Sequence, residues 1–194
     1  MKDIQEIQGD NKTDIVPNLT TVTEFELWLL KQSELADKRF EFVDGRIIEK
    51  EGMKQNDVII LKFLSRLFVK TPEYEAGDEL FGEIDSYIND RRKRIPDIVY
   101  WTAEQIEAFG KGKKLATSFA IEILSPNDNF QDVAEKIQDY FEAGAKLVWY
   151  ILPKQEQIYV YTAPTEVKIL KGDDICSGEP VLSDFSFTVK KMFV

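Results

Sequence analysis

A strand, a helix and a second strand follow one another in the C-terminal half of the chain, and this order constrains the fold more than any other feature. Residues 119–124 and 147–152 are almost wholly apolar, which is typical of strands buried on both faces. Residues 131–143 between them carry apolar side chains at helical spacing and end before Gly144. Because such a crossover joins parallel strands, the sequence predicts an α/β fold in which α-helices flank a mixed central β-sheet.

Two further helices are predicted nearer the N-terminus. The first begins at a capping box, with Thr23 as the N-cap and Glu26 three residues on, and continues to about Leu35. The second extends from Asn56 to about Val69, where apolar residues again recur at helical spacing. This second helix is amphipathic, so we expect it to bury one face.

Two hairpins are predicted as well. Residues 39–49 are divided by an Asp-Gly dipeptide at positions 44–45, which tolerates the positive φ angles of a two-residue turn. Residues 80–88 alternate between the two faces of a strand, and the pattern continues after a basic turn in residues 95–101. We expect these last two segments to be adjacent strands of one hairpin.

The length of 194 residues fits one domain of ordinary size. We expect this domain to occupy residues 19–194, and the polar residues 1–18 to form a flexible tail. The tail lacks the apolar region of a secretory signal, so the expected compartment is the cytoplasm. No apolar run reaches the length of a membrane span, and no membrane partner is expected.

The chain contains no histidine and one cysteine, Cys176, which excludes many kinds of active site. Catalytic triads, Cys-His pairs and zinc sites with histidine ligands all require residues that are absent. A nucleotide-binding loop is also absent, because the glycines around residues 110–112 lack the required spacing. Catalysis would depend on carboxylates, Lys, Arg, Tyr, Ser or Thr, with Mg²⁺ or Mn²⁺ as the metal that oxygen ligands favour.

The charge distribution gives conflicting indications about nucleic acid. The 25 basic and 35 acidic residues sum to a net charge of −10, which argues against phosphate binding. However, four basic residues are consecutive at positions 91–94, and three lysines lie in the stretch 111–114. Each cluster is interpreted equally well as a solvated turn.

Glu122 and Asp97 are the first candidates for a functional site. Glu122 is the one charged residue in an apolar strand, where a carboxylate is costly unless a cation or hydrogen bonds compensate it. Asp97 lies at a comparable place on the preceding predicted strand, so pairing of the two strands would bring both carboxylates together. The common alternative is that each acid is exposed at a strand end or pairs with an arginine.

Lys136 and Glu41 are weaker candidates. Lys136 flanks the apolar stripe of the predicted helix, so its ammonium could reach past the sheet to the acid pair. The alternative is an ordinary helical ion pair with Asp132. Glu41 lies between two phenylalanines beside the Asp-Gly turn and could be a third acid, although such residues usually face outward.

Three short motifs follow one another along the chain: Arg94-Ile95-Pro96-Asp97, then residues 119–126, then Asp132-x-x-x-Lys136 with Tyr140. Together they resemble the Uma-type family of proposed restriction endonucleases, which is similar to the PD-(D/E)XK nuclease superfamily. The resemblance extends from about residue 19 to the C-terminus.

This resemblance implies a restriction-endonuclease-like fold with a Mg²⁺ site. Asp97 matches the first motif acid and Glu122 the second, and both would hold the metal. The superfamily lysine normally lies two residues after the second acid, where this chain has Leu124. In such variants a lysine of the neighbouring helix replaces it, which implies this role for Lys136. Glu41 matches the acid contributed by the N-terminal part.

The implied reaction is hydrolysis of phosphodiester bonds in DNA with Mg²⁺, or Mn²⁺, as the cofactor. Arg92 and Arg94 would contact phosphates beside the scissile bond, and Tyr140 would orient the water or the substrate. Because the chain is acidic, we expect DNA binding to be weak and salt-sensitive.

Two hypotheses from different classes remain open. The first is a metal-dependent endonuclease, which the motif residues favour. The second is a catalytically silent binding or regulatory module with the same fold, which could form a homo-oligomer that buries Trp101 and Phe109. The second is favoured by the displaced lysine, by the net charge, and by Lys54-Gln55-Asn56, where relatives often carry a histidine.

Overall fold

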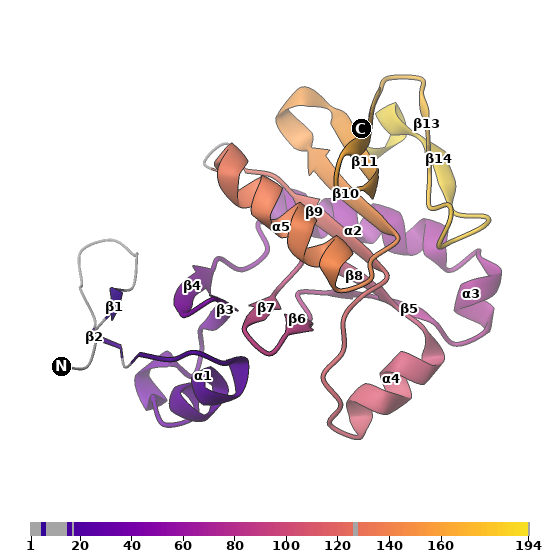
Figure 1. Cartoon of the computed structure of the whole chain (residues 1–194). Helices are drawn as coiled ribbons and strands as arrows, with labels where there is room; N and C mark the ends of the chain where they lie inside the picture. The colour runs from indigo at the N-terminus through magenta and orange to yellow at the C-terminus, as the bar shows by residue number, and fades with distance from the viewer. Residues whose placement is uncertain (1–4, 7–14, 17, 126–127, 194) are drawn as a thin grey trace.

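Two β-sheets organise the structure, a computed structural model that describes residues 5–6, 15–16, 18–125 and 128–193 (Figure 1). The larger sheet contains, in spatial order, β12 (Glu166–Lys171), β11 (Gln157–Ala163), β10 (Leu147–Leu152), β9 (Phe119–Ile123), β8 (Ile98–Trp101) and β5 (Glu79–Gly82). The smaller sheet contains β4 (Arg46–Lys50), β3 (Arg39–Val43), β7 (Arg92–Arg94) and β6 (Ser86–Asn89).

The helices and two short ribbons complete the described elements. The α-helices are α1 (Val22–Leu29), α2 (Gln55–Phe68), α3 (Pro72–Glu75), α4 (Ala103–Gly110) and α5 (Phe130–Glu142). Short 3₁₀ segments occur at Ser33–Leu35, Pro153–Gln155 and Val189–Met192. The ribbons pair β1 (Gln5–Glu6) with β2 (Ile15–Val16) and β13 (Ile175–Ser177) with β14 (Ser186–Thr188).

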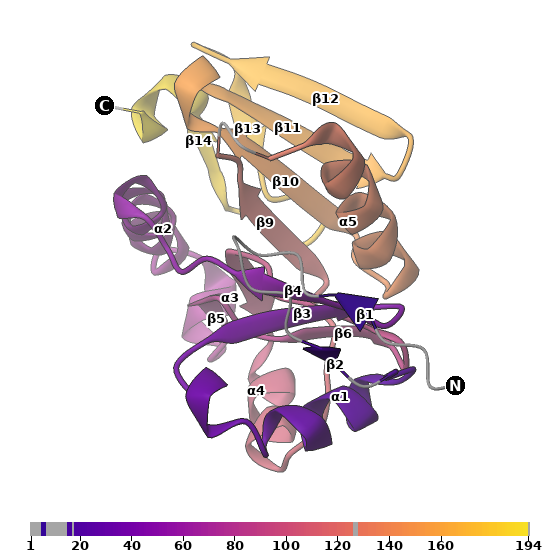
Figure 2. The ribbon, with the colours of Figure 1, turned by 90° about the vertical axis from the view of Figure 1, so that its left-hand side faces the viewer.

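Helices α2 and α5 lie on opposite sides of the larger sheet (Figure 2). On β9, Phe119, Ile121 and Ile123 belong to the apolar cluster that α2 and the C-terminal segment complete. Ala120 belongs to the cluster on the α5 side. Because strand residues alternate between faces, Glu122 is directed toward α5. Both faces of β9 are buried, which explains its nearly continuous apolar sequence.

The predicted crossover is confirmed. Strands β9 and β10 pair in parallel with Glu122 opposite Tyr150, and α5 connects them within one residue of its predicted bounds. Helix α2 also agrees with its prediction to within one residue. The hairpin β3–β4 turns at Asp44 and Gly45, whose φ angles are 49° and 89°. The fold class predicted from the sequence is therefore the one observed.

The predicted start and end of the first helix were wrong. Thr21, two residues before the predicted cap, is extended, and its hydroxyl accepts a hydrogen bond from the backbone N–H of Glu24. The Glu24 carboxylate accepts the Thr21 N–H in return, so the capping box lies two residues earlier. Helix α1 ends at Leu29, and the predicted continuation to Leu35 is a separate 3₁₀ turn. Two Thr-x-x-Glu spacings overlap here, which the sequence pattern alone does not separate.

The long hairpin predicted from residues 80–101 is divided between the two sheets. Strand β5 pairs with β8 in the larger sheet, whereas β6 pairs with β7 in the smaller one. Between them, Glu83 has a φ of 50° and donates its backbone N–H to the carbonyl of Asp97 at 3.0 Å. The two predicted strands are therefore four, and Asp97 lies at the bend between the sheets.

The proposed oligomer contact through Trp101 conflicts with the structure. The Trp101 residue is only 2% exposed, and its ring packs against Phe81 and Phe109. Phe109 remains partly exposed and covers one side of the Trp101 ring. Because its surface is already used inside the chain, Trp101 cannot supply an interface between copies of this protein.

Most of the predicted N-terminal tail, residues 1–18, lies outside the described residues. Within the ranges that are described, no helix has the length and apolar character needed to cross a bilayer. The assignment of residues 19–194 to one domain stays a prediction.

The C-terminal segment packs on the larger sheet through a close backbone approach at Gly178. A Cβ at this position would lie 2.9 Å from the Cβ of Leu182 and 3.0 Å from Cδ1 of Phe185, whose ring stacks on Trp149. We predict that Gly178→Ala destabilises the protein by about 1–3 kcal/mol through overpacking, measured by urea unfolding. Gly110→Ala is the control, because nothing lies within 4 Å of its Cβ. Equal stability of both variants would contradict the packing argument.

Candidate active site

A cleft of about 790 Å³ opens where the two sheets meet α5. Its lining includes the carboxylates of Glu41, Asp97 and Glu122 and the ammonium groups of Lys50 and Lys136. All three acids are buried, with residue exposures of 3%, 6% and 4%. Buried carboxylates at the edge of a cleft are uncommon unless charge partners or ligands compensate them, so their contacts identify the candidate site.

Asp97 and Glu122 are brought together by the pairing of β8 with β9. Ile98 lies opposite Ile121 in this antiparallel pair, which places the residue before Ile98 beside the residue after Ile121. Asp97 Oδ2 accepts a hydrogen bond of 2.6 Å from the backbone N–H of Ile123. The convergence expected from the sequence is therefore the arrangement observed, and Asp97 closes the end of the ladder.

Lys136 contacts two of the acids. From α5 its Nζ lies 3.1 Å and 3.2 Å from the two carboxylate oxygens of Glu122. It also lies 3.3 Å from Oε1 of Glu41. The alternative partner of Lys136, Asp132, is engaged at the N-terminus of α5, where its carboxylate accepts a hydrogen bond from the side-chain amide of the N-cap residue Asn129. Lys136 thus reaches Glu122, one member of the predicted acid pair, and its second carboxylate partner is Glu41 in place of Asp97.

Lys50 is a second lysine at the site, and the sequence analysis missed it. It ends β4, and its Nζ lies 2.7 Å from Oδ1 of Asp97 and 3.9 Å from Oε2 of Glu122. The sequence did contain a signal for the position of Lys50. The Asp-Gly turn fixes the hairpin register with Glu41 opposite Ile48, and Lys50 shares that face two residues on.

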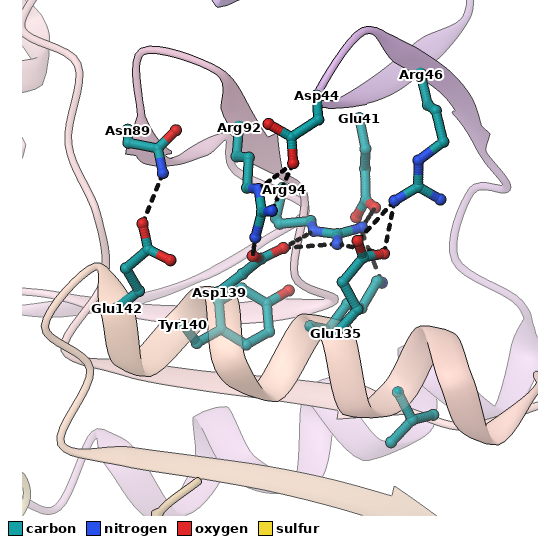
Figure 3. A network of polar contacts seen from close by, with 12 residues as sticks. Glu41, Asp44, Arg46, Asn89, Arg92, Arg94, Glu135, Asp139, Tyr140 and Glu142 are labelled. Carbon is teal, nitrogen blue, oxygen red and sulfur yellow. Dashed lines mark hydrogen bonds and ion pairs between the residues drawn. The ribbon is translucent and has the colours of Figure 1, made fainter.

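Arg94 lies beneath the site as an internal counter-ion. Its Nη1 is 3.0 Å from Oε2 of Glu41, and its guanidinium is 2.6 Å from Oδ2 of Asp139 (Figure 3). Arg94 is 1% exposed and Asp139 is fully buried. Arg94 borders the cleft, but its guanidinium is engaged by protein carboxylates, and its predicted contact with substrate phosphates stays untested.

Arg92 is also engaged within the chain. It forms ion pairs with Asp44 at 2.5 Å and with Asp139 at 2.6 Å. The remaining cations of the basic run behave alike, since Arg91 pairs with Asp44 and Lys93 with Asp85. The basic run that suggested phosphate binding is thus largely used to neutralise acids of the same protein.

The acidic face of α5 completes this network. Glu135, Asp139 and Glu142 follow at intervals of four and three residues, so they share one side of the helix. Glu135 pairs with Arg46 at 2.6 Å, and Glu142 accepts a hydrogen bond from the side chain of Asn89 (Figure 3). The smaller sheet and α5 are therefore joined by charge, and this junction fixes the helix that carries Lys136.

Tyr140 is directed at Glu122 from the same helix. Its hydroxyl donates a hydrogen bond to Oε1 of Glu122, and the residue is 1% exposed. Burial, reinforced by the neighbouring carboxylates, raises the pKa of Tyr140 well above its ordinary value. At neutral pH it is a protonated donor that orients Glu122, and its predicted contact with substrate stays untested.

Burial and neighbouring charges shift the pKa values of the other site residues. Burial raises the pKa of Glu122, although Lys136 and Lys50 oppose the shift. Burial also disfavours the charged form of Glu41, but Lys136 and Arg94 outweigh it, and the pKa falls. For Lys50, burial is outweighed by Glu122 and Asp97, which raise the pKa. Both the ammonium and the Glu41 carboxylate are therefore charged at neutral pH.

Within the described ranges, no group of three or more His, Cys, Asp and Glu side chains is arranged around one point as metal ligands would be. Lys50 lies between Asp97 and Glu122, and Lys136 lies between Glu122 and Glu41. Each adjacent pair of acids shares one ammonium group.

Comparison with known proteins identifies the family. Residues 22–190 match the Uma2 family, described as "Putative restriction endonuclease". The chain belongs to this family. A similar solved structure is that of "a putative nuclease belonging to DUF820" from Anabaena variabilis, with 22% sequence identity and a TM-score of 0.72. The match covers 89% of this chain and 97% of the other and shows a shared fold. No curated protein matches.

We predict that Asp139→Asn destabilises the protein by about 3 kcal/mol, because it leaves the buried cation of Arg94 undercompensated. The free energy of unfolding in urea measures the effect. Glu142→Gln on the same helix is the matched control, since it changes one hydrogen bond at the surface and should alter stability by less than about 0.5 kcal/mol. Similar stabilities for both variants would show that the buried pair contributes little.

Proposed function

We propose that the protein is a nuclease that hydrolyses phosphodiester bonds in DNA with a divalent metal ion. The observation that carries this proposal is the convergence of Asp97 and Glu122 with Lys136 in one cleft. Family membership adds support, because the matched family is described as "Putative restriction endonuclease". These residue types suit metal-assisted hydrolysis and need no histidine.

The donor set fits Mg²⁺ better than a softer metal. Mg²⁺ is commonly held by one or two carboxylates, with waters and substrate phosphates completing its shell. Asp97 and Glu122 supply two such carboxylates, and their oxygens already converge on one cation, the ammonium of Lys50. Bound there, the metal would lower the pKa of a water and shield the phosphate charge.

The other side chains would act on substrate or on the acids. Lys136 is positioned to stabilise the negative charge that develops on the phosphate, since its ammonium lies beside Glu122 at the edge of the cleft. Glu41 holds Lys136 from the opposite side and is itself held by Arg94. Tyr140 fixes one oxygen of Glu122. Arg92 and Arg94 are left as structural counter-ions in this proposal.

DNA binding must draw on few free cations. Among the described residues that line the cleft, Lys54 pairs with Glu51, and Lys154 forms no ion pair. The surface is acidic overall, so association with DNA should be weak and should decrease steeply with salt.

A catalytically silent module is the second candidate. The observation that favours it is that two lysines already neutralise the acids that would bind metal. The same fold without turnover could then serve as a binding unit. Metal-dependent cleavage of DNA distinguishes the two candidates, because the nuclease would cleave DNA and the silent module would not.

We predict that the purified protein cleaves supercoiled DNA at low salt when Mg²⁺ or Mn²⁺ is present. Asp97→Asn and Glu122→Gln should each abolish cleavage, because each removes a metal ligand. Glu49→Gln should retain it, since Glu49 lies at the cleft rim and pairs with Lys38. Retained cleavage in either acid variant would refute the site assignment, and an inactive wild type would favour the silent module.

We predict that Lys136→Met lowers turnover about 100-fold or more while leaving metal affinity undiminished, because the lysine acts on phosphate charge and is not a ligand. Single-turnover cleavage and calorimetric titration with Mn²⁺ measure the two quantities separately. Equal loss of both would mean that Lys136 mainly holds the acids in place.

A further inference from the structure

Lys50 occupies the point at which the two proposed metal ligands meet. Its ammonium is 2.7 Å from Asp97 and 3.9 Å from Glu122, whereas the described contacts of Lys136 are with Glu122 and Glu41. Lys50 is therefore the lysine that bridges the acid pair itself. A metal ion held by these two carboxylates could not occupy the position of the Lys50 ammonium at the same time, because like charges at contact distance repel strongly.

The charge balance of the site also opposes simultaneous binding of a metal ion and the Lys50 ammonium. Glu41, Asp97 and Glu122 are compensated by Lys50, Lys136 and one side of Arg94. A divalent cation added to this balanced cluster would leave two excess positive charges in a buried site. If one ammonium leaves the site, the excess positive charge falls from two to one. Arg94 cannot leave, because it is enclosed by Glu41, Glu135 and Asp139.

A second cavity offers the Lys50 ammonium an alternative position. This cavity of about 350 Å³ adjoins the end of β4, and its lining includes Lys50, Glu49, Glu51 and Glu83. Lys50 lines both this cavity and the main cleft. Its side chain is 15% exposed and sits on a flexible four-carbon stem.

Glu83 provides a receiving group in that second cavity. Its Oε1 is buried and has no hydrogen-bond partner in the described part of the chain. A buried carboxylate oxygen without a partner is costly, so an ammonium that reached it would be stabilised. Glu83 also stands at the bend beside Asp97, to whose carbonyl it donates its backbone N–H. Asp97 pairs with Lys50, and Glu83 lines the same second cavity as Lys50.

We propose that Lys50 is the resident counter-ion of the Asp97–Glu122 pair, and that a divalent metal binds by displacing its ammonium toward Glu83. This inference rests on the proposed function, since it assumes that the acid pair binds metal. Lys50 then sets the metal affinity of the site and keeps the buried acids neutralised when no metal is bound.

Calorimetric titration with Mn²⁺ tests the exchange without any cleavage assay. Lys50→Met removes the competing cation, so Mn²⁺ should bind at least about tenfold more tightly than to the wild type. Lys54→Met is the matched control, because this lysine of the same cleft pairs with exposed Glu51 and should leave the affinity unchanged. Unchanged or weaker binding to Lys50→Met would overturn the proposal.

The receiving position is tested by a double-mutant cycle. Glu83→Gln should weaken Mn²⁺ binding by at least about threefold in the wild-type background, because the displaced ammonium loses its partner. In the Lys50→Met background the same substitution should have no effect. An equal effect in both backgrounds, or none in either, would overturn the movement toward Glu83.

Failure of this inference is distinguishable from failure of the proposed function. If Mn²⁺ binds to the wild type and Asp97→Asn abolishes binding, but Lys50→Met does not tighten it, only the exchange is refuted. If neither the wild type nor Lys50→Met binds Mn²⁺, the metal site and the exchange are both refuted. Circular dichroism checks folding, and Lys50→Gln, a shorter polar replacement, substitutes for Lys50→Met if that variant does not fold.

Discussion

The burial of like charges between the two sheets is the constraint on which the structure depends. Glu41, Asp97, Glu122 and Asp139 are all nearly inaccessible to water, so each needs a cation or several hydrogen-bond donors. The chain meets this need by placing a basic strand, β7, against the acidic face of α5. The same ion pairs therefore pack the helix onto the sheet and neutralise the acids. A helix that shifted along the sheet would lose the partners of Arg94, which makes the position of Lys136 a consequence of the charge network.

The bend between the sheets links this network to the candidate site. Arg94 ends β7 in the smaller sheet, and Asp97, three residues later, precedes β8 in the larger one. The short connection thus holds a structural cation at one end and a proposed metal ligand at the other. The carbonyl of Asp97 and its carboxylate are both fixed, by the N–H groups of Glu83 and Ile123. Rigid support of this kind is what a site needs if its carboxylates are to stay aligned without a metal.

Much of the fold and part of the site followed from local pattern. The crossover, α2, α5 and the Asp-Gly hairpin were predictable because apolar spacing and turn chemistry act over short distances. The division of residues 80–101 between two sheets was not, since alternation is the same on either side of a bend. Asp97 and Glu122 could be placed because strand pairing predicts their approach. The burial of Arg94 could not, because a run of basic residues looks alike whether it faces phosphate or the acids of a distant helix.

The cations around the acids differ in how firmly they are held, and this difference separates a structural ion pair from an exchangeable one. Arg94 contacts three carboxylates and its side chain is 2% exposed, whereas the side chains of Lys50 and Lys136 are 15% and 18% exposed at the wall of a cleft. A buried ion pair resists exchange when removal of one partner strands the other in the core. In the proposed exchange at Asp97 and Glu122, the ammonium would move toward Glu83, whose Oε1 has no hydrogen-bond partner among the described residues, and the carboxylates would gain a divalent cation. If the proposed exchange occurs, neutralisation by lysine keeps the acids stable in the absence of metal and is compatible with metal binding at the same carboxylates.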